Sequence, residues 1–153
     1  AEAETENDLY FVFTSQEEVG LRGAGVAAFS VEPDVAIAVD VTDTGDLPER
    51  KTPMAVDMGK GPAVKVMDRS VICTPAVCAA LEQAGADCGV ATQREILQFG
   101  GTDTAALQKA RAGVQAGAVS IPTRYIHSPS EMCAVSDVEG AAKLLAGFAV
   151  GQN

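Results

Sequence analysis

Short apolar runs, separated by polar turns that contain glycine or proline, follow one another along the chain from residue 9 onward. They predict five strands, over residues 9–14, 34–42, 62–67, 89–97 and 116–122. The first run, Leu9–Thr14, is apolar at almost every position, which is typical of a strand buried on both faces of a sheet. The fourth run alternates with polar residues, so one face of that strand is expected to meet water.

Stretches in which alanine and other apolar residues recur with helical spacing lie between these runs. They predict four helices: residues 21–31, a helix from Pro75 to near Gly85 with Thr74 as its N-cap, residues 104–112, and a final helix to about Val150 that Asp137 caps. The alternation of strands and helices indicates a single α/β domain, with a mostly parallel sheet and helices on both of its faces.

The charge of the chain limits the partners that it can have. Its 153 residues include 21 acidic and 11 basic ones, which gives a formal net charge of −10. This charge argues against nucleic acid and anionic membranes as partners. No apolar run approaches the roughly 20 residues that span a bilayer, and the N-terminal AEAETEND has no signal-peptide pattern. We therefore expect a cytoplasmic protein.

The four cysteines, Cys73, Cys78, Cys88 and Cys133, form no C-x-x-C pair. A chain of this length has no need of disulfide staples, so reduced and mostly buried thiols are favoured over a disulfide or a metal site.

Acidic residues and the single histidine fall near the carboxyl ends of the predicted strands. Glu17 and Glu18 follow the first strand, Asp40 lies late in the second, and His127 follows the fifth. The carboxyl ends of parallel strands share one edge of a sheet, which is where α/β proteins build their sites. Two carboxylates and an imidazole can bind zinc, cobalt or manganese, and a spare glutamate can act as a general base on a bound water.

Each of these residues also has a structural interpretation without chemistry. Asp40 could begin a turn, and Asp43 and Asp46 compete with it as ligands. We prefer Asp40 because a carboxylate inside an apolar strand needs a compensating partner. A single histidine in a loop is more often a surface residue than a ligand, and adjacent glutamates are usually solvated.

Two glycine-rich turns allow further interpretations. The GKGP sequence at 59–62 resembles a phosphate loop but lacks the other residues of that motif. In the GGTD sequence at 100–103, backbone N–H groups could hold an anion or a substrate carbonyl, and a tight turn into a helix explains the glycines equally well.

Several longer motifs, in one order, resemble a known enzyme family. They are TSQEEVGLRGA at 14–24, AVDVTDTGDLP at 38–48, MGKGPAVKVMDRS at 58–70, FGGTDTAALQKARAGV at 99–114 and SIPTRYIHSPSEM at 120–132. Together they resemble the co-catalytic dimetal aminopeptidases of the glutamyl or deblocking type, members of which are also labelled endoglucanase or cellulase M. The resemblance implies a zinc-exopeptidase-like fold and covers nearly the whole chain after residue 8.

The resemblance implies a role for each candidate residue. Glu17 corresponds to the general base that takes a proton from the metal-bridging water. Glu18 and His127 correspond to ligands of one metal ion, and Asp40 to a ligand of the other. The two divalent ions would be zinc or cobalt.

The same resemblance places Gly101, Thr102 and Asp103 at the border of the substrate pocket. The substrate would be a peptide whose free α-amino group is held nearby, so that cleavage removes the N-terminal residue.

This chain also departs from the family pattern. The family's site needs a second histidine in an H-x-D motif and a bridging aspartate, both of which precede the first strand predicted here, and this chain has one histidine. The family's oligomerisation domain lies in the same earlier part. Residues 1–153 are therefore expected to be the carboxyl-terminal part of a catalytic domain whose sheet is incomplete at its N-terminal side. We expect little or no activity from the isolated chain, which would need the missing N-terminal half or assembly into a homo-oligomer.

Two other functions remain open at the level of the sequence. The chain could be a non-catalytic α/β module that associates with another chain through an exposed sheet edge. A glycan hydrolase, as the endoglucanase label suggests, needs two carboxylates facing each other across a sugar, and the adjacent Glu17 and Glu18 do not suggest that geometry.

Overall fold

The computed structural model describes residues 5–48 and 51–151, so the first four residues of the acidic N-terminal segment lie outside it. The helices and strands, in chain order, are α1 (Arg22–Val31), β1 (Val35–Asp43), β2 (Ala63–Met67), α2 (Pro75–Asp87), β3 (Gln93–Ile96), α3 (Thr104–Gln108), β4 (Gln115–Arg124), β5 (Met132–Cys133) and α4 (Val135–Gly151).

The strands form one mixed sheet in the order β1-β4-β2-β3, with β5 added to β4. β1 runs parallel to β4 from the pair Val35–Gln115 to the pair Asp43–Thr123, and β2 runs parallel to β3. β2 and β5 are antiparallel to β4. The predicted α/β fold with a mostly parallel sheet is confirmed, and the antiparallel pairing of β2 with β4 is the feature that local sequence did not indicate.

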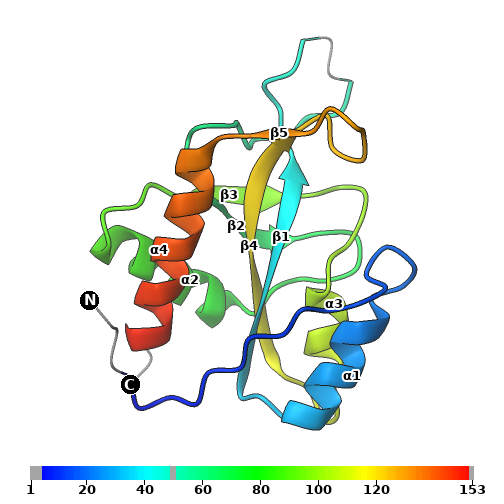
Figure 1. Ribbon diagram of the computed structural model, residues 1–153, viewed down its shortest axis with the longest axis vertical. Coiled ribbons are helices and arrows are strands. Elements are labelled where there is room, and N and C mark those ends of the chain that lie inside the picture. Colours follow the sequence, from blue (N-terminus) through cyan, green and yellow to red (C-terminus); the bar gives the residue numbers. More distant parts are fainter. Residues whose placement is uncertain (1–4, 49–50, 152–153) are drawn as a thin grey trace.

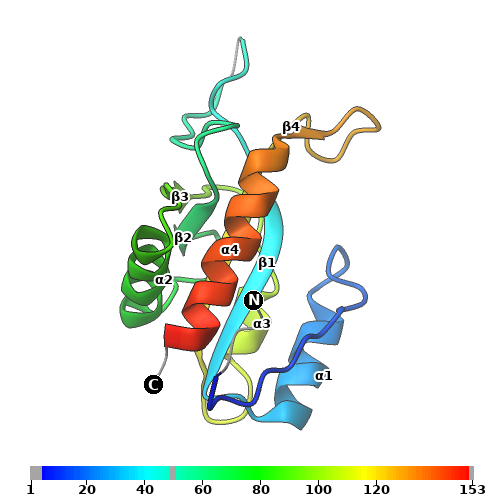
Figure 2. The ribbon, with the colours of Figure 1, turned by 60° about the vertical axis from the view of Figure 1, so that its left-hand side comes forward.

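Helices cover both faces of this sheet, as predicted (Figure 1). Figure 2 shows α2 and α4 on one side of the sheet and α1 and α3 on the other. The main core lies under α2 and α4, where Leu81, Leu144 and Phe148 pack on Val64 and Val119 of the sheet. The other face, under α1 and α3, is lined mostly by alanines and by polar side chains that are described below.

The predicted first strand over Leu9–Thr14 is wrong. This segment has no secondary structure and runs from the end of α4 to the loop before α1 (Figure 1). Tyr10 is 66% exposed, Phe11 85% and Phe13 98%. An apolar run shows that side chains favour burial, but a strand also needs a neighbour for its backbone groups, and among the described residues none pairs with this segment.

Two other elements are shorter than the sequence suggested, and one short strand was not predicted. β3 begins at Gln93 because Gly89 is left-handed and the Val90 N–H donates to Gly85 O, which closes α2. α3 ends at Gln108, and Arg111 with φ 50° cannot continue it. β5 has two residues and was not predicted.

The side chains at two predicted helix caps are used elsewhere. Thr74 precedes α2 as expected, but its hydroxyl accepts a hydrogen bond from Ala116 N rather than from its own helix. Asp137 lies in the first turn of α4, and its carboxylate bonds to a distant loop.

The cysteines are free, and they are less buried than expected. Cys73 is buried, Cys78 and Cys88 are half-buried, and Cys133 is exposed. Burial raises the pKa of the Cys73 thiol to about 12. Within the described part of the chain, none of the helices has the length and apolar character that crossing a bilayer requires.

Candidate functional site

The two adjacent glutamates lie in a tight loop that leads into α1. Gly20 N and Leu21 N both donate to Glu17 O, and Gly23 N donates to Ser15 O. Gln16 and Leu21 are held in the left-handed region, with φ of 61° and 56°. Non-glycine residues rarely adopt this conformation, and they cluster at functional sites when the surroundings fix them.

Asp40 lies on β1 and is half-buried. Its Oδ1 accepts a hydrogen bond of 2.7 Å from the N–H of Val41. Burial raises the pKa of the Asp40 carboxyl, although this hydrogen bond and the charge of Lys65 act in the opposite direction. A carboxyl group in such a position gains from any positive charge brought to it.

The turn before α3 brings a further carboxylate to the same place. Asp103 Oδ2 accepts a 2.7 Å hydrogen bond from the hydroxyl of Thr14, at the end of the exposed apolar segment. The other oxygen of Asp103, Oδ1, is buried and has no hydrogen-bond partner among the described residues. A buried oxygen without a donor marks a position that favours a cation or a donor group.

The electrostatics of Glu17 show that these groups lie together. Burial raises the pKa of Glu17 most, and the charges of Asp40, Glu18 and Asp103 raise it further. His127 lowers it. Four carboxylates and the single imidazole, from four separate parts of the chain, therefore interact through space.

His127 reaches the site from the loop after β4. Its backbone is left-handed, with φ of 60°, and its N–H donates to the carboxylate of Glu131. The imidazole Nε2 lies 3.4 Å from Glu18 Oε1, and both side chains are exposed. The structure thus brings Glu17, Glu18, Asp40 and His127 together.

The remaining predicted site residues have different surroundings. The side chain of Thr102 is buried and bonds to Asp68 and Thr104, so only its backbone can face a substrate. Gly101 is exposed, and a Cβ there would lie 2.6 Å from Ser70 Oγ, so the turn needs glycine to approach the loop after β2.

The donors at the site have the chemistry of a metal site but do not close around one point. Carboxylate and imidazole suit zinc or cobalt. Within residues 5–48 and 51–151, however, no group of three histidine, cysteine, aspartate or glutamate side chains is arranged to hold a metal ion. Glu18 and His127 supply one adjacent pair of donors, and Asp40 lies within electrostatic range of Glu17 and Glu18.

The competing acid Asp46 has another role. Arg124 at the end of β4 binds it through two hydrogen bonds of 3.1 and 2.6 Å, which lower the pKa of Asp46 to about 2. Asp43 accepts a hydrogen bond from Thr44 N.

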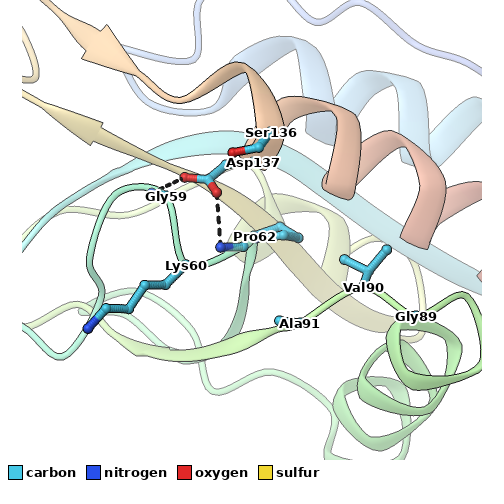
Figure 3. A pocket seen from close by; sticks show the side chains of 9 residues that line it. Gly59, Lys60, Pro62, Gly89, Val90, Ala91, Ser136 and Asp137 are labelled. Carbon is cyan, nitrogen blue, oxygen red and sulfur yellow. Dashed lines mark hydrogen bonds between the residues drawn. The ribbon is translucent and has the colours of Figure 1, made fainter.

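The GKGP loop already binds a carboxylate of the chain itself. Figure 3 shows the Asp137 side chain beside Gly59. Its carboxylate accepts hydrogen bonds from the N–H groups of Gly59 and Gly61, at 2.6 and 2.9 Å. Beside them is an open pocket of about 310 Å³, which is also lined by Lys60, Val90 and Ser136. Because both amides are engaged by Asp137, the structure explains this motif as a loop that joins β2 to α4.

A buried ion pair between Lys65 and Glu95 lies next to the site and was not predicted from the sequence. Glu95 lies in the run predicted to have one face in water, and Lys65 is a single polar residue in an otherwise apolar run, so neither position indicated a buried ion pair. Only the register of β2 and β3 shows that the two side chains face each other.

The sheet is mostly parallel and helices cover both of its faces. Carboxylates on β1 and in the loops beside it gather with an imidazole, so the protein belongs to the class of α/β proteins with an acidic, histidine-containing site. The model of the M42 glutamyl aminopeptidase family matches residues 1–144, and the chain is a member of that family.

Known proteins support this assignment. A putative aminopeptidase of Acetivibrio thermocellus is 55% identical over 141 residues, which are 92% of this chain and 42% of that protein. Aminopeptidase APDkam598 of the archaeon Desulfurococcus kamchatkensis has a similar structure, with a TM-score of 0.88 and 36% identity over 92% of this chain and 40% of that one.

A third similar structure is the TET1 peptidase of Pyrococcus horikoshii, which can assemble into a tetrahedron or a large octahedral shell. Its TM-score is 0.78 at 32% identity, over 91% of this chain and 40% of that one. The chain therefore spans about two fifths of the length of the relatives it matches.

Proposed function

We propose that this chain is the carboxyl-terminal part of a single α/β metallopeptidase catalytic domain. The complete enzyme would be an aminopeptidase that hydrolyses the N-terminal residue of peptides. The family assignment supports the aminopeptidase activity, and the observation that carries the assignment of the site is the convergence of Glu17, Glu18, Asp40 and His127. When bound, two divalent ions, zinc or cobalt, would polarise the scissile carbonyl and lower the pKa of water.

Glu17 would be the general base. It is less exposed than Glu18, and burial and its acidic neighbours raise its pKa above the ordinary value of a glutamate, which suits a group that must accept a proton and pass it on. Because a base must be ionised, activity should rise with pH as Glu17 loses its proton.

Glu18 and His127 would hold one ion and Asp40 the other. The 3.4 Å contact between the first two requires little movement to let both face a common ion. Asp40 lies on β1, whose nine residues pair with β4, so its backbone position is fixed by a regular ladder.

Residues Gly101, Thr102 and Asp103 would border the substrate. Gly101 offers exposed backbone. Asp103 Oδ1, which has no hydrogen-bond partner within residues 5–48 and 51–151, is a suitable acceptor for a donor group of the peptide. The partners of the whole protein would be peptides and further copies of itself, and the net charge of −10 disfavours nucleic acid and membranes.

The isolated chain should have little or no aminopeptidase activity, because the described residues do not close a three-ligand site. The test uses chromogenic aminoacyl substrates with added Zn²⁺ or Co²⁺. Robust turnover by the 153-residue chain alone would contradict the proposal that it is an incomplete catalytic domain.

Complementation then tests the site. The chain is co-expressed with the preceding segment of the Acetivibrio thermocellus relative, which is 55% identical in the shared part. Activity should appear in the complex and should fall by about 100-fold or more in the Glu17→Gln variant, because a general base contributes this much. A matched control is Glu6→Gln, an exposed glutamate near the chain start that should leave activity unchanged. A folded complex whose activity Glu17→Gln leaves unchanged would refute the assignment of the base.

The exposed apolar segment Leu9–Phe13 favours a second candidate function, a non-catalytic module that binds another chain. In that case the complex would form without gaining activity toward any aminoacyl substrate, whichever ion is added.

A further inference from the structure

A buried ion pair crosses the sheet on the face that carries Asp40. Lys65 on β2 and Glu95 on β3 are register partners, and both are fully buried. Lys65 Nζ lies 2.6 Å from Glu95 Oε1. Asp40 pairs in register with Ser120, and Ser120 with Ala63, so Lys65, two residues further along β2, lies on the same face of the sheet as Asp40.

Hydrogen bonds extend this pair in two directions. Toward β1, the hydroxyl of Thr42 donates to the same oxygen of Glu95 at 2.8 Å, and Thr42 is two residues beyond Asp40. Toward the turn before α3, Lys65 Nζ lies 3.5 Å from Asp68 Oδ2, which accepts a 3.3 Å hydrogen bond from the hydroxyl of Thr102.

The continuous chain of contacts is therefore Thr42, Glu95, Lys65, Asp68, Thr102. One end is attached to the strand of Asp40. The other end is attached to the residue immediately before Asp103.

Such a network costs free energy to bury. Removing charges from water is expensive, and a buried ion pair is often no more stabilising than well-packed apolar residues of similar volume. Glu95 Oε2 also lacks a hydrogen-bond partner among the described residues, so part of the penalty is left uncompensated. Buried polar groups of this kind can instead fix one geometry among several.

We propose that Lys65 is a positioning residue, whose ammonium group, through Glu95 and Asp68, fixes the β1 segment that carries Asp40 relative to the turn that carries Asp103. The proposal extends the proposed function, because Asp40 and Asp103 come from separate elements and must keep a constant spacing to act on one substrate.

The test compares local and global effects of Lys65→Met in the 153-residue chain. The local reporters are backbone amides: Val41 N–H, which donates to Asp40 Oδ1, and Ala106 and Leu107 N–H, which donate to Asp103 O. Leu144, in the core on the opposite face of the sheet, is the global reporter.

We expect Lys65→Met to shift the NMR signals of Val41 and Asp103 and to speed hydrogen exchange of Ala106 and Leu107 by about tenfold or more, as local opening does. Exchange at Leu144 should change far less. Lys60→Met is the matched control, because Lys60 is an exposed lysine that pairs with Asp57 and should leave all these signals unchanged.

If Lys65→Met does not fold, Glu95→Gln decides the question, since it keeps the shape and the acceptor for Thr42 and removes the charge that faces Lys65. We expect Glu95→Gln to cause the same local changes in NMR signals and hydrogen exchange as Lys65→Met, but smaller ones. Equal acceleration at all amides, Leu144 included, would show a merely structural role, and unchanged signals at Val41 and Asp103 would also overturn the proposal.

The outcome is independent of activity. Glu17→Gln should lower turnover by about 100-fold or more in the complemented enzyme without moving the Ala106 and Leu107 signals. Failure of the aminopeptidase assignment and failure of the Lys65 assignment are therefore distinguishable.

Discussion

At the scale of single residues, the position of the glutamate pair depends on a glycine. Gly23 in the first turn of α1 lies so close to the loop that a Cβ would be 2.6 Å from both the nitrogen and the oxygen of Ser15. The Gly23 N–H also donates to Ser15 O. The close approach of these two backbones holds the loop of Glu17 and Glu18 against the helix.

Replacing Gly23 by alanine should therefore move this loop. We expect Gly23→Ala to lower the free energy of unfolding by about 1–3 kcal/mol, as overpacking does. The matched control is Gly25→Ala in the same helix, where the nearest atom to a Cβ is 3.9 Å away and the helix propensity of alanine should add up to about 1 kcal/mol. Urea unfolding measures both, and equal stability of the two variants would contradict the packing seen at Ser15.

The ion pair of Asp46 with Arg124 predicts an acid-sensitive contribution to stability. Hydrogen bonds from Arg124 lower the pKa of Asp46 to about 2, so the folded chain binds this proton less tightly than the unfolded chain, whose aspartates have a pKa of about 3.9. The ion pair therefore stabilises the folded chain at pH values above the pKa that Asp46 has in the unfolded chain. This stabilisation is lost as the pH falls toward about 2.

Asp46→Asn should accordingly be less stable than the unmodified chain near neutral pH, and the difference should vanish near pH 2. Asp34→Asn, an exposed aspartate before β1, is the control and should have no such pH dependence. Denaturant unfolding at several pH values measures the difference, and a gap that stays constant with pH would refute the explanation.

At the scale of elements, the loop between residues 59 and 62 joins β2 to α4 through one carboxylate. Asp137 is buried and accepts hydrogen bonds from both Gly59 and Gly61 (Figure 3). Both glycines have positive φ, 85° and 96°, but they differ in the room around them. A Cβ on Gly61 would lie 2.0 Å from Ala91 O, whereas one on Gly59 meets nothing within 4 Å.

Substituting these two glycines by alanine distinguishes the stability cost of a strained backbone from the cost of a steric clash. Gly59→Ala should cost about 1–2 kcal/mol, the penalty of a left-handed conformation for a residue with a Cβ. Gly61→Ala carries the same penalty and must also displace the Ala91 backbone, so it should be clearly less stable than Gly59→Ala in thermal or urea unfolding. Equal stability of the two variants would contradict the close approach of Gly61 to the Ala91 backbone.

At the scale of the whole molecule, apolar surface is concentrated on the segment 9–13, while the net charge is −10. Charge keeps molecules apart, but an apolar strip of aromatic side chains favours association with whatever can cover it. The free edge of β1, the last strand on that side of the sheet order, adds unpaired backbone groups among the described residues.

Placing acidic residues on this segment should reduce association of the chain with itself. The double variant Phe11→Asp, Phe13→Asp replaces side chains that are 85% and 98% exposed, so its folded stability should be nearly unchanged while binding of a hydrophobic dye falls. A large loss of stability in the variant would mean that the segment is packed in solution. Sedimentation and dye fluorescence measure the two effects.

Local sequence was sufficient to predict a helix or strand where the residues of that element alone determine its structure. The β-branched alternation of residues 34–42 and the proline after Thr74 specify a strand and a helix start from neighbours alone, and β1 and α2 lie where they were expected. The types of residue at the candidate site could also be predicted, because Asp40 is a charged residue inside an apolar run.

Tertiary structure decided which side chains meet: Glu18 with His127, Lys65 with Glu95, and Asp137 with a loop more than 70 residues away. It also decided that the apolar run at residues 9–13 is exposed, because hydrophobicity is a property of a segment, whereas burial needs a second surface that the segment does not specify.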